Sequence, residues 1–170
     1  MAKVIKANGR LFLIISLLWV ILDQFTKYLV VKEIDYYSSG IEITPFFNIV
    51  HVYNKGAAFS FLASMGGWQC WFFVGVAVII TLVLLVLLLK TPKSKPWTCL
   101  AISLIIGGAV GNLIDRVVLG HVVDFLLFYI KTDSGIWAYP AFNVADIGVC
   151  VGAALLVIIS IFGKDEKEQR

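Results

Sequence analysis

The stretch WQCWFFVGVAVIITLVLLVLLL, residues Trp68 to Leu89, has no charged residue in 22 positions. A helix rises about 1.5 Å per residue, so this stretch can extend about 33 Å, which is enough to cross the hydrocarbon core of a bilayer. The stretch therefore predicts a membrane-spanning helix.

The rest of the chain repeats this pattern. Of its 170 residues, 60% are hydrophobic and only 15% are charged, whereas a soluble domain has about 25% charged residues. No segment outside the apolar runs is long enough to build a core of its own. We therefore expect an all-α membrane protein, a four-helix transmembrane bundle forming a single domain over residues 1–170. The expected helices are 10–31, 68–89, 97–118 and 141–162.

The first run has a basic flank, as a signal peptide would. A cleavage site with small residues does not follow Leu22, and the polar segment Asp23-Gln24-Phe25-Thr26-Lys27 stands there instead. We interpret the run as an uncleaved first helix.

The Lys and Arg residues beside the runs predict the orientation, because their bias sets the topology of membrane proteins. Nine lie near the termini or in the loop between the second and third runs, and three lie in the other two loops. Both termini are therefore expected to be cytoplasmic. The nine are Lys3, Lys6, Arg10, Lys90, Lys93, Lys95, Lys164, Lys167 and Arg170, and the three are Lys32, Lys55 and Lys131.

The two loops on the outer side have distinct compositions. The segment Ile41–Phe61 is rich in β-branched and aromatic residues, so we expect a small β-rich outer subdomain there. The segment Gly120–Pro140 carries five aromatic residues, which are typical of the membrane interface.

Polar and ionisable residues gather at the outer ends of the runs. Asp146 lies five residues into the fourth run, roughly 8 Å below its boundary. A charge at the bilayer centre costs about 2.5–3.5 kcal/mol, so an ionisable group at such a depth indicates a functional site. The other polar residues at this level are Asp23, Gln24, Lys27, Asn54, Asn112, Asp115, Arg116, His121, Asp124 and Asn143.

Several of these residues have a structural interpretation. Asp23 and Lys27 stand at i and i+4 and can form an ion pair. Arg116 can anchor the end of its helix or hold a carbonyl or phosphate of a substrate, and both alternatives stay open. Gly107, Gly108 and Gly111 favour close helix packing.

Metal or thiol chemistry has little support. His51 and His121 belong to no metal-binding motif. The three cysteines, Cys70, Cys99 and Cys150, lack metal spacing and are interpreted as small apolar residues. We expect no metal and no cofactor.

Asp124 and Asp146 reach the same depth if the third and fourth helices pack side by side. Two carboxyl groups in a place of low dielectric share one proton near neutral pH. Such a pair can take a proton from water and give one to a carbonyl oxygen, as aspartic proteases do. A proton relay would use paired acids as well.

Five ordered stretches carry a resemblance to a known family. They are D23-Q24-F25-T26-K27, N54-K55-G56-A57-A58-F59-S60, G111-N112-L113-I114-D115-R116, V122-V123-D124-F125 and F142-N143-V144-A145-D146. With these stretches the chain resembles lipoprotein signal peptidase, also called signal peptidase II or prolipoprotein signal peptidase.

The resemblance implies an aspartic endopeptidase of the bacterial cytoplasmic (inner) membrane, with its active site near the periplasmic face. Its substrates would be prolipoproteins whose cysteine carries diacylglyceryl, cut just before that cysteine. Membrane lipids and globomycin-type inhibitors would be further partners, and nucleic acid would not. The catalytic pair maps onto Asp124 and Asp146. The supporting residues map onto Asn54, Asn112, Arg116 and Asn143, with Asp23, Lys27 and Asp115 as structural polar residues.

Two other functions compete with this one. A small proton-coupled transporter would use the same aspartates as a relay, but it predicts polar residues through the whole depth of the membrane. A structural or assembly subunit gives no reason for two acids at matching depth.

Overall fold

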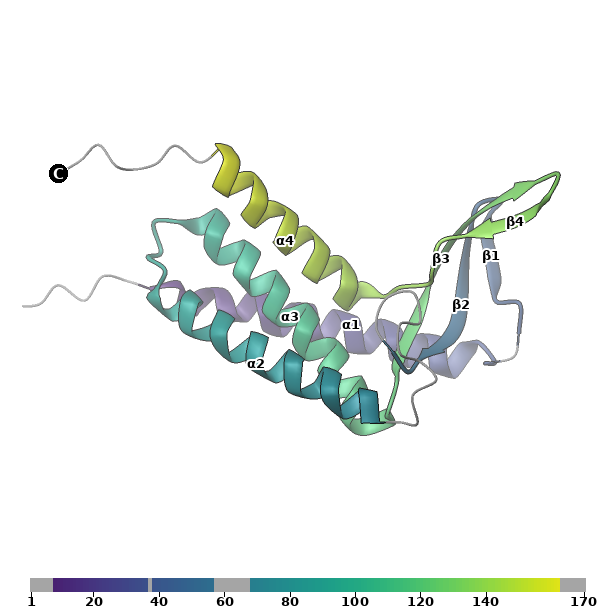
Figure 1. The fold of residues 1–170 in the computed structure, drawn as a ribbon, viewed down its shortest axis with the longest axis horizontal. Coiled ribbons are helices and arrows are strands. Elements are labelled where there is room, and N and C mark those ends of the chain that lie inside the picture. Colours follow the sequence, from purple (N-terminus) through teal and green to yellow (C-terminus); the bar gives the residue numbers. More distant parts are fainter. Residues whose placement is uncertain (1–7, 37, 57–67, 163–170) are drawn as a thin grey trace, which may run out of the picture.

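The computed structural model describes residues 8–36, 38–56 and 68–162. Its helical part comprises a short 3-10 helix η1 and four long helices, which run side by side (Figure 1). The prediction of four apolar helices is confirmed. The bounds are η1 Gly9–Phe12, α1 Leu13–Glu33, α2 Trp68–Lys90, α3 Pro96–Leu119 and α4 Val144–Phe162.

By length and hydropathy, four helices in the described ranges qualify as membrane spans. They include α3, which packs against each of the other three and is the most buried, with half of its apolar window inside the protein against 6% for α2. The central helix is therefore the one whose polar side chains can meet those of its neighbours.

Small residues let α3 approach its neighbours closely. A Cβ atom on Gly107 would lie 2.8 Å from Trp19 of α1, and one on Gly152 would lie 2.6 Å from the Ala101 carbonyl. Gly108 faces the carbonyl of Ala145 on α4. The packing role expected for the glycines of α3 is therefore present.

The strands form one antiparallel sheet in the order β1-β2-β3-β4, beyond one end of the bundle (Figure 1). The expected fold class, an all-α bundle with a β-rich segment at 41–61, understates this sheet. Its two further strands come from the segment that was assigned to the interface for its aromatic residues. The bounds are β1 Ile41–Thr44, β2 Phe47–Asn54, β3 Val122–Thr132 and β4 Gly135–Ala138. The last five residues of the expected β-rich segment, 57–61, lie outside the described ranges.

Strand β3 pairs with β2 and begins with four buried residues, Val122 to Phe125. Val123 and Phe125 pack with Val30 and Ile34 at the end of α1, and strand alternation places Asp124 on the opposite face. Aromatic pairing continues along β3, where Phe128 lies 4.7 Å from Phe47 of β2 between ring centroids. The alternation of the strand therefore directs Asp124 away from this apolar cluster.

The turn from α3 into β3 is made at Gly120. This residue adopts φ 76°, a left-handed conformation that favours glycine, and its N–H donates to the Arg116 carbonyl. The chain reverses there and brings Asp124 back beside the end of α3.

Candidate active site

Asp146 belongs to a capping box at the start of α4. The Asp146 backbone N–H donates to Asn143 Oδ1 over 3.0 Å, and the Asn143 N–H donates to Asp146 Oδ2 over 3.2 Å. This reciprocal cap explains why α4 begins at Val144 and not at the expected residue 141. It also explains how a carboxyl group is held near the start of an apolar helix, where the helix dipole favours negative charge.

Asp124 lies on β3 with a side chain that is almost fully buried. Asn54 Nδ2 donates to Asp124 Oδ2 over 3.0 Å, and Asn143 Nδ2 donates to Oδ1 over 2.6 Å. Both oxygens therefore have a neutral amide donor.

Asn143 connects the two acids. Its side chain donates to Asp124 and its backbone N–H donates to Asp146. Asn112 completes the connection from α3, because its Nδ2 donates to Asp146 Oδ1 over 2.8 Å and its Oδ1 accepts from Asn143 Nδ2 over 3.2 Å. The two acids thus belong to one network, in which α3, α4 and β3 each contribute residues.

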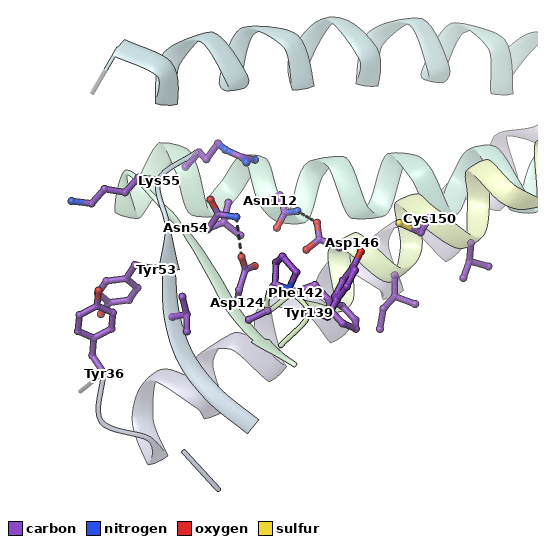
Figure 2. Close-up of a pocket in the computed structure, with 17 residues that line it drawn as sticks. Tyr36, Tyr53, Asn54, Lys55, Asn112, Asp124, Tyr139, Phe142, Asp146 and Cys150 are labelled. Atoms are coloured by element: carbon purple, nitrogen blue, oxygen red, sulfur yellow. Dashed lines mark hydrogen bonds between the residues drawn. The ribbon is translucent and has the colours of Figure 1, made fainter. Parts of the chain in front are cut away.

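Both acids line a cavity of about 720 Å³ (Figure 2). Figure 2 shows Tyr36 and Tyr53 at one end of the cavity and Cys150 at the other, with the two acids between them. Ile147, Cys150 and Val151 form an apolar wall on the membrane-spanning helix α4. The cavity therefore combines a polar centre with a wall that a hydrocarbon chain can contact.

Burial, together with the nearby Asp146 carboxyl, raises the pKa of Asp124 to about 7, against the hydrogen bonds from Asn54 and Asn143. Asp124 can therefore hold or release a proton near neutral pH. This is the property that a general acid or base requires.

Arg116 also lines the cavity. Its Nη2 donates to the Gly56 carbonyl over 3.2 Å, and its guanidinium carbon lies 5.5 Å from the Phe73 ring centroid. Its contacts are therefore structural in this state, although the cavity gives a substrate access to it. Residues 57–60 of the stretch that begins at Asn54 lie outside the described ranges.

A second polar cluster lies behind the acids. Lys27 Nζ lies 2.9 Å from Asp23 Oδ2 and 2.9 Å from Asp115 Oδ2, so the pair expected from the i, i+4 spacing forms and gains a third member. All three side chains are buried. We call this group the Lys27 cluster.

The remaining candidates lie away from the two acids. His51 is buried and its Nδ1 contacts the Ile34 carbonyl at 2.8 Å. His121 packs on the Tyr53 ring at 3.9 Å between centroids, and burial lowers its pKa. Within the described residues, no group of three or more His, Cys, Asp or Glu is placed to hold a metal ion.

The sequence patterns placed Gln24 among the polar residues without giving it a role, and they did not assign aromatic residues to the cavity wall. Gln24 Nε2 donates to Asp115 Oδ1 over 2.8 Å and to the Gly111 carbonyl over 3.1 Å, which joins α1 to α3. Tyr139 and Phe142 line the cavity beside Asp146. Their position directly before a motif that carries a carboxyl group is the signal that could have identified them.

Fold and site together define a multi-span membrane protein with a carboxyl pair suited to proton transfer in an open cavity. The family model described as Signal peptidase (SPase) II matches residues 15–162. The chain belongs to the signal peptidase II family. It is therefore a protease, and its apolar helices fit a protein of the bacterial inner membrane.

Similar proteins support this assignment. A lipoprotein signal peptidase of Aeromonas hydrophila is 49% identical over 95% of this chain and 94% of its own length. One of Alteromonas mediterranea is 45% identical over 99% of this chain and 90% of its own length. A solved structure described as a bacterial membrane enzyme, determined by the in meso method at 2.3 Å resolution, matches with a TM-score of 0.78 and 32% identity, covering 97% of this chain and 98% of that one.

Proposed function

We propose that the chain is an aspartic endopeptidase that removes the signal peptide from prolipoproteins whose cysteine carries diacylglyceryl, cutting just before that cysteine. The observation that carries the proposal is Asn143, a fully buried residue that donates to both Asp124 and Asp146, the two acids that line the cavity. A transporter relay has no comparable support, because the family is one of peptidases.

In the proposed mechanism Asp124 carries the shared proton and Asp146 is ionised. Two donors, Asn112 Nδ2 and the Asn143 N–H, stabilise negative charge on Asp146. Asp146 takes a proton from water while the water oxygen bonds to the scissile carbonyl carbon. Asp124 donates its proton to the carbonyl oxygen, which gives a tetrahedral intermediate with no covalent bond to the enzyme.

The intermediate then collapses. The carbonyl re-forms as its hydroxyl proton returns to Asp124, the carbon–nitrogen bond breaks, and the proton on Asp146 passes to the leaving nitrogen. The products are a carboxylic acid on the signal peptide and an amine on the lipidated cysteine. Each carboxyl group ends in its starting protonation state, so no metal and no cofactor are needed.

The proposed placement puts the sheet and the cavity at the periplasmic face, with both termini in the cytoplasm. The bias of Lys and Arg in the sequence supports this orientation. The apolar wall on α4 suits a substrate whose acyl chains stay in the bilayer while its peptide bond reaches the acids. Arg116, Asn54 and Lys55 line the same cavity and are the proposed groups for holding the peptide.

The test uses the purified full-length protein in detergent with a synthetic diacylglyceryl prolipoprotein, and mass spectrometry of the products. Asp124→Asn and Asp146→Asn are each expected to lower the cleavage rate by at least about 10³-fold, since a general acid or base contributes about 10²–10⁴. Asp133→Asn, an exposed aspartate in the turn after β3, is the matched control and should cleave normally.

Folding of each variant is checked by thermal unfolding and gel filtration. Full activity in either cavity variant removes that residue from the mechanism. EDTA is expected to have no effect, and a globomycin-type cyclic peptide is expected to inhibit. Cleavage of a prolipoprotein without the lipid, at the same rate, would contradict the proposed substrate.

A further inference from the structure

Lys27 is enclosed by its partners. It is 3% exposed and is absent from the residues that line the cavity. Its Nζ lies 2.9 Å from each of three acceptors, Asp23 Oδ2, Asp115 Oδ2 and Asn112 Oδ1. An ammonium group has three hydrogens, so these acceptors satisfy it fully. Lys27 therefore has no hydrogen left for a substrate.

Each of the two carboxylates also accepts a hydrogen bond from a backbone N–H group. Asp115 Oδ2 accepts from the Val123 N–H over 3.1 Å, and Asp23 Oδ1 accepts from the Ala145 N–H over 2.8 Å. Val123 is the residue directly before Asp124, and Ala145 is the residue directly before Asp146. The Lys27 cluster therefore fixes the backbone at the residue directly before each acid.

The third partner of Lys27 acts on the acid side chains. Because Asn112 Oδ1 accepts from Lys27, the Nδ2 end of the same amide faces Asp146 and donates to Oδ1 over 2.8 Å. An amide turned the other way round would present an oxygen to the Asp146 carboxylate. The Lys27 ammonium, together with the longer bond from Asn143 Nδ2, thus favours the orientation in which Asn112 supports Asp146.

Without Lys27, the side chains of Asp23, Asp115 and Asn112 lose the ammonium group that all three contact. Asp23 and Asp115 would be two buried carboxylates with no counter-charge, an arrangement that strongly destabilises a folded protein. The pair would relax by moving apart or taking up water. Either response shifts Val123 and Ala145, and with them the spacing of the two acids.

We propose that Lys27 is a positioning residue for the reaction, which sets the relative placement of Asp124 and Asp146 through Asp115, Asp23 and Asn112. The inference rests on the proposed function, because it assigns a role to Lys27 only if the two acids act together. It goes beyond a structural ion pair, since it places the consequence in the catalytic step.

The experiment measures kcat and KM of Lys27→Met, which keeps most of the length of the stem and removes the charge. A displacement of about 1 Å at a reacting group costs roughly 100-fold, so kcat should fall about 100-fold. KM should stay within about twofold, because Lys27 does not line the cavity. Lys32→Met, at the exposed end of the same helix, is the matched control and should match the unsubstituted protein.

The pH profile of kcat separates positioning from mere folding. The positive charge of Lys27 lowers the pKa of Asp124, so its removal should move the profile to higher pH. A smaller folded fraction would lower the rate equally at every pH. The charged groups around Asp124 are Lys27 on α1, Arg116 on α3 and Asp146 on α4, with Lys55 lining the same cavity, and the last three are unchanged in the variant.

If Lys27→Met does not fold, Lys27→Met combined with Asp23→Asn removes one of the two unpaired carboxylates, while the amide oxygen of the introduced asparagine can still accept from the Ala145 N–H. The same loss of kcat and the same shift in pH are expected. A kcat within about threefold of the unsubstituted protein, a loss confined to KM, or an unshifted pH profile overturns the inference.

Asp124→Asn and Asp146→Asn run alongside, so that the two proposals can fail separately. If these variants cleave normally, the proposed function fails. If they are inactive beside a normal Lys27→Met, only the positioning role of Lys27 fails.

Discussion

Two pairs of carboxyl groups lie at the sheet end of the helix bundle, and a different residue stands between the members of each pair. Asp23 and Asp115 have the Lys27 ammonium between them, whereas Asp124 and Asp146 have Asn143, whose side-chain amide donates to Asp124 and whose backbone N–H donates to Asp146. The first pair is closed off and holds backbone amides in place. The second pair faces a cavity, and in the described part of the chain no Lys or Arg forms an ion pair with it.

The difference shows how a pair of neighbouring carboxyl groups can serve two purposes. A cation between two carboxylates offsets their mutual repulsion and gives each of them a donor. A neutral amide between them leaves the repulsion in place, so one member keeps a proton near neutral pH. The residue in the middle therefore decides whether the pair is an anchor or a proton carrier.

After the two acids themselves, the largest effect on cleavage is expected from removing the central residue of the open pair. Asn143→Ser keeps a good helix cap, because serine caps about as well as asparagine, but its side chain is too short to reach Asp124. Cleavage of a diacylglyceryl prolipoprotein should fall about 10²- to 10³-fold, as on loss of one transition-state donor. Asn48→Ser is the control: Asn48 accepts a bond from Tyr129 outside the cavity lining, and this variant should retain its kcat.

The role proposed for Asn143 between Asp124 and Asp146 would be contradicted if Asn143→Ser stayed folded and cleaved substrate at the rate of the unsubstituted protein. In that case the amide bridge would have no part in catalysis, and the comparison between the two central residues would lose its meaning.

A smaller effect is expected on the free energy of unfolding. The difference between Asp124→Asn and the unsubstituted protein should depend on pH. The pKa of Asp124 is about 7 in the folded protein against 3.8 for an ordinary aspartate. The folded state therefore binds a proton that the unfolded state has released, so this group costs stability as pH rises from about 4 to 7. The free energy of unfolding of Asp124→Asn should accordingly rise by about 2–4 kcal/mol, relative to the unsubstituted protein, as the pH increases from about 4 to 8.

Thermal unfolding in detergent at several pH values measures this difference. Asp115→Asn sharpens the comparison, because it removes a charge that Lys27 needs and should destabilise the protein at neutral pH. If Asp124→Asn lost stability as the pH rose, relative to the unsubstituted protein, the raised pKa would be contradicted.

The smallest effect is expected at Asn54, which supports only one member of the open pair. Its Nδ2 donates to Asp124 Oδ2 over 3.0 Å, and an ordinary hydrogen bond contributes about 0.5–1.5 kcal/mol. Asn143 remains as a donor to the other oxygen, so Asn54→Ala should lower kcat about tenfold. Its pH profile should move to higher pH, because the Asn54 hydrogen bond lowers the pKa of Asp124. An unchanged pH profile, measured by initial rates from about pH 5 to pH 9, would show that this bond is not made in solution.

Much of the site could be anticipated from the sequence because its residues occur in short motifs. The capping relation of Asn143 and Asp146 is three residues long, and the pair of Asp23 and Lys27 is four residues long. The bond from Asn143 to Asp124 spans 19 residues, and the bond from Ala145 to Asp23 spans 122. Such contacts depend on which helices pack together, which no local pattern contains. The matching depth of Asp124 and Asp146 indicated their pairing, and the resemblance to a family supported it.

The sheet was anticipated less completely. Strand β2 lies in a segment rich in β-branched residues, whereas β3 has aromatic residues that fit an interface equally well. What makes β3 a strand is pairing with β2 and the burial of Val123 and Phe125 against the end of α1. These contacts are tertiary, so composition alone could not distinguish the two outcomes.

Four apolar helices, and the gathering of polar residues at one end of them, follow from the amino-acid order alone, because hydropathy adds up residue by residue along the chain. Only the folded arrangement places an ammonium between one pair of acids and an amide between the other. The effect of a carboxyl group depends on which charge or dipole lies within a few ångströms of it, and that neighbour is set by the packing of α1, α3, α4 and β3.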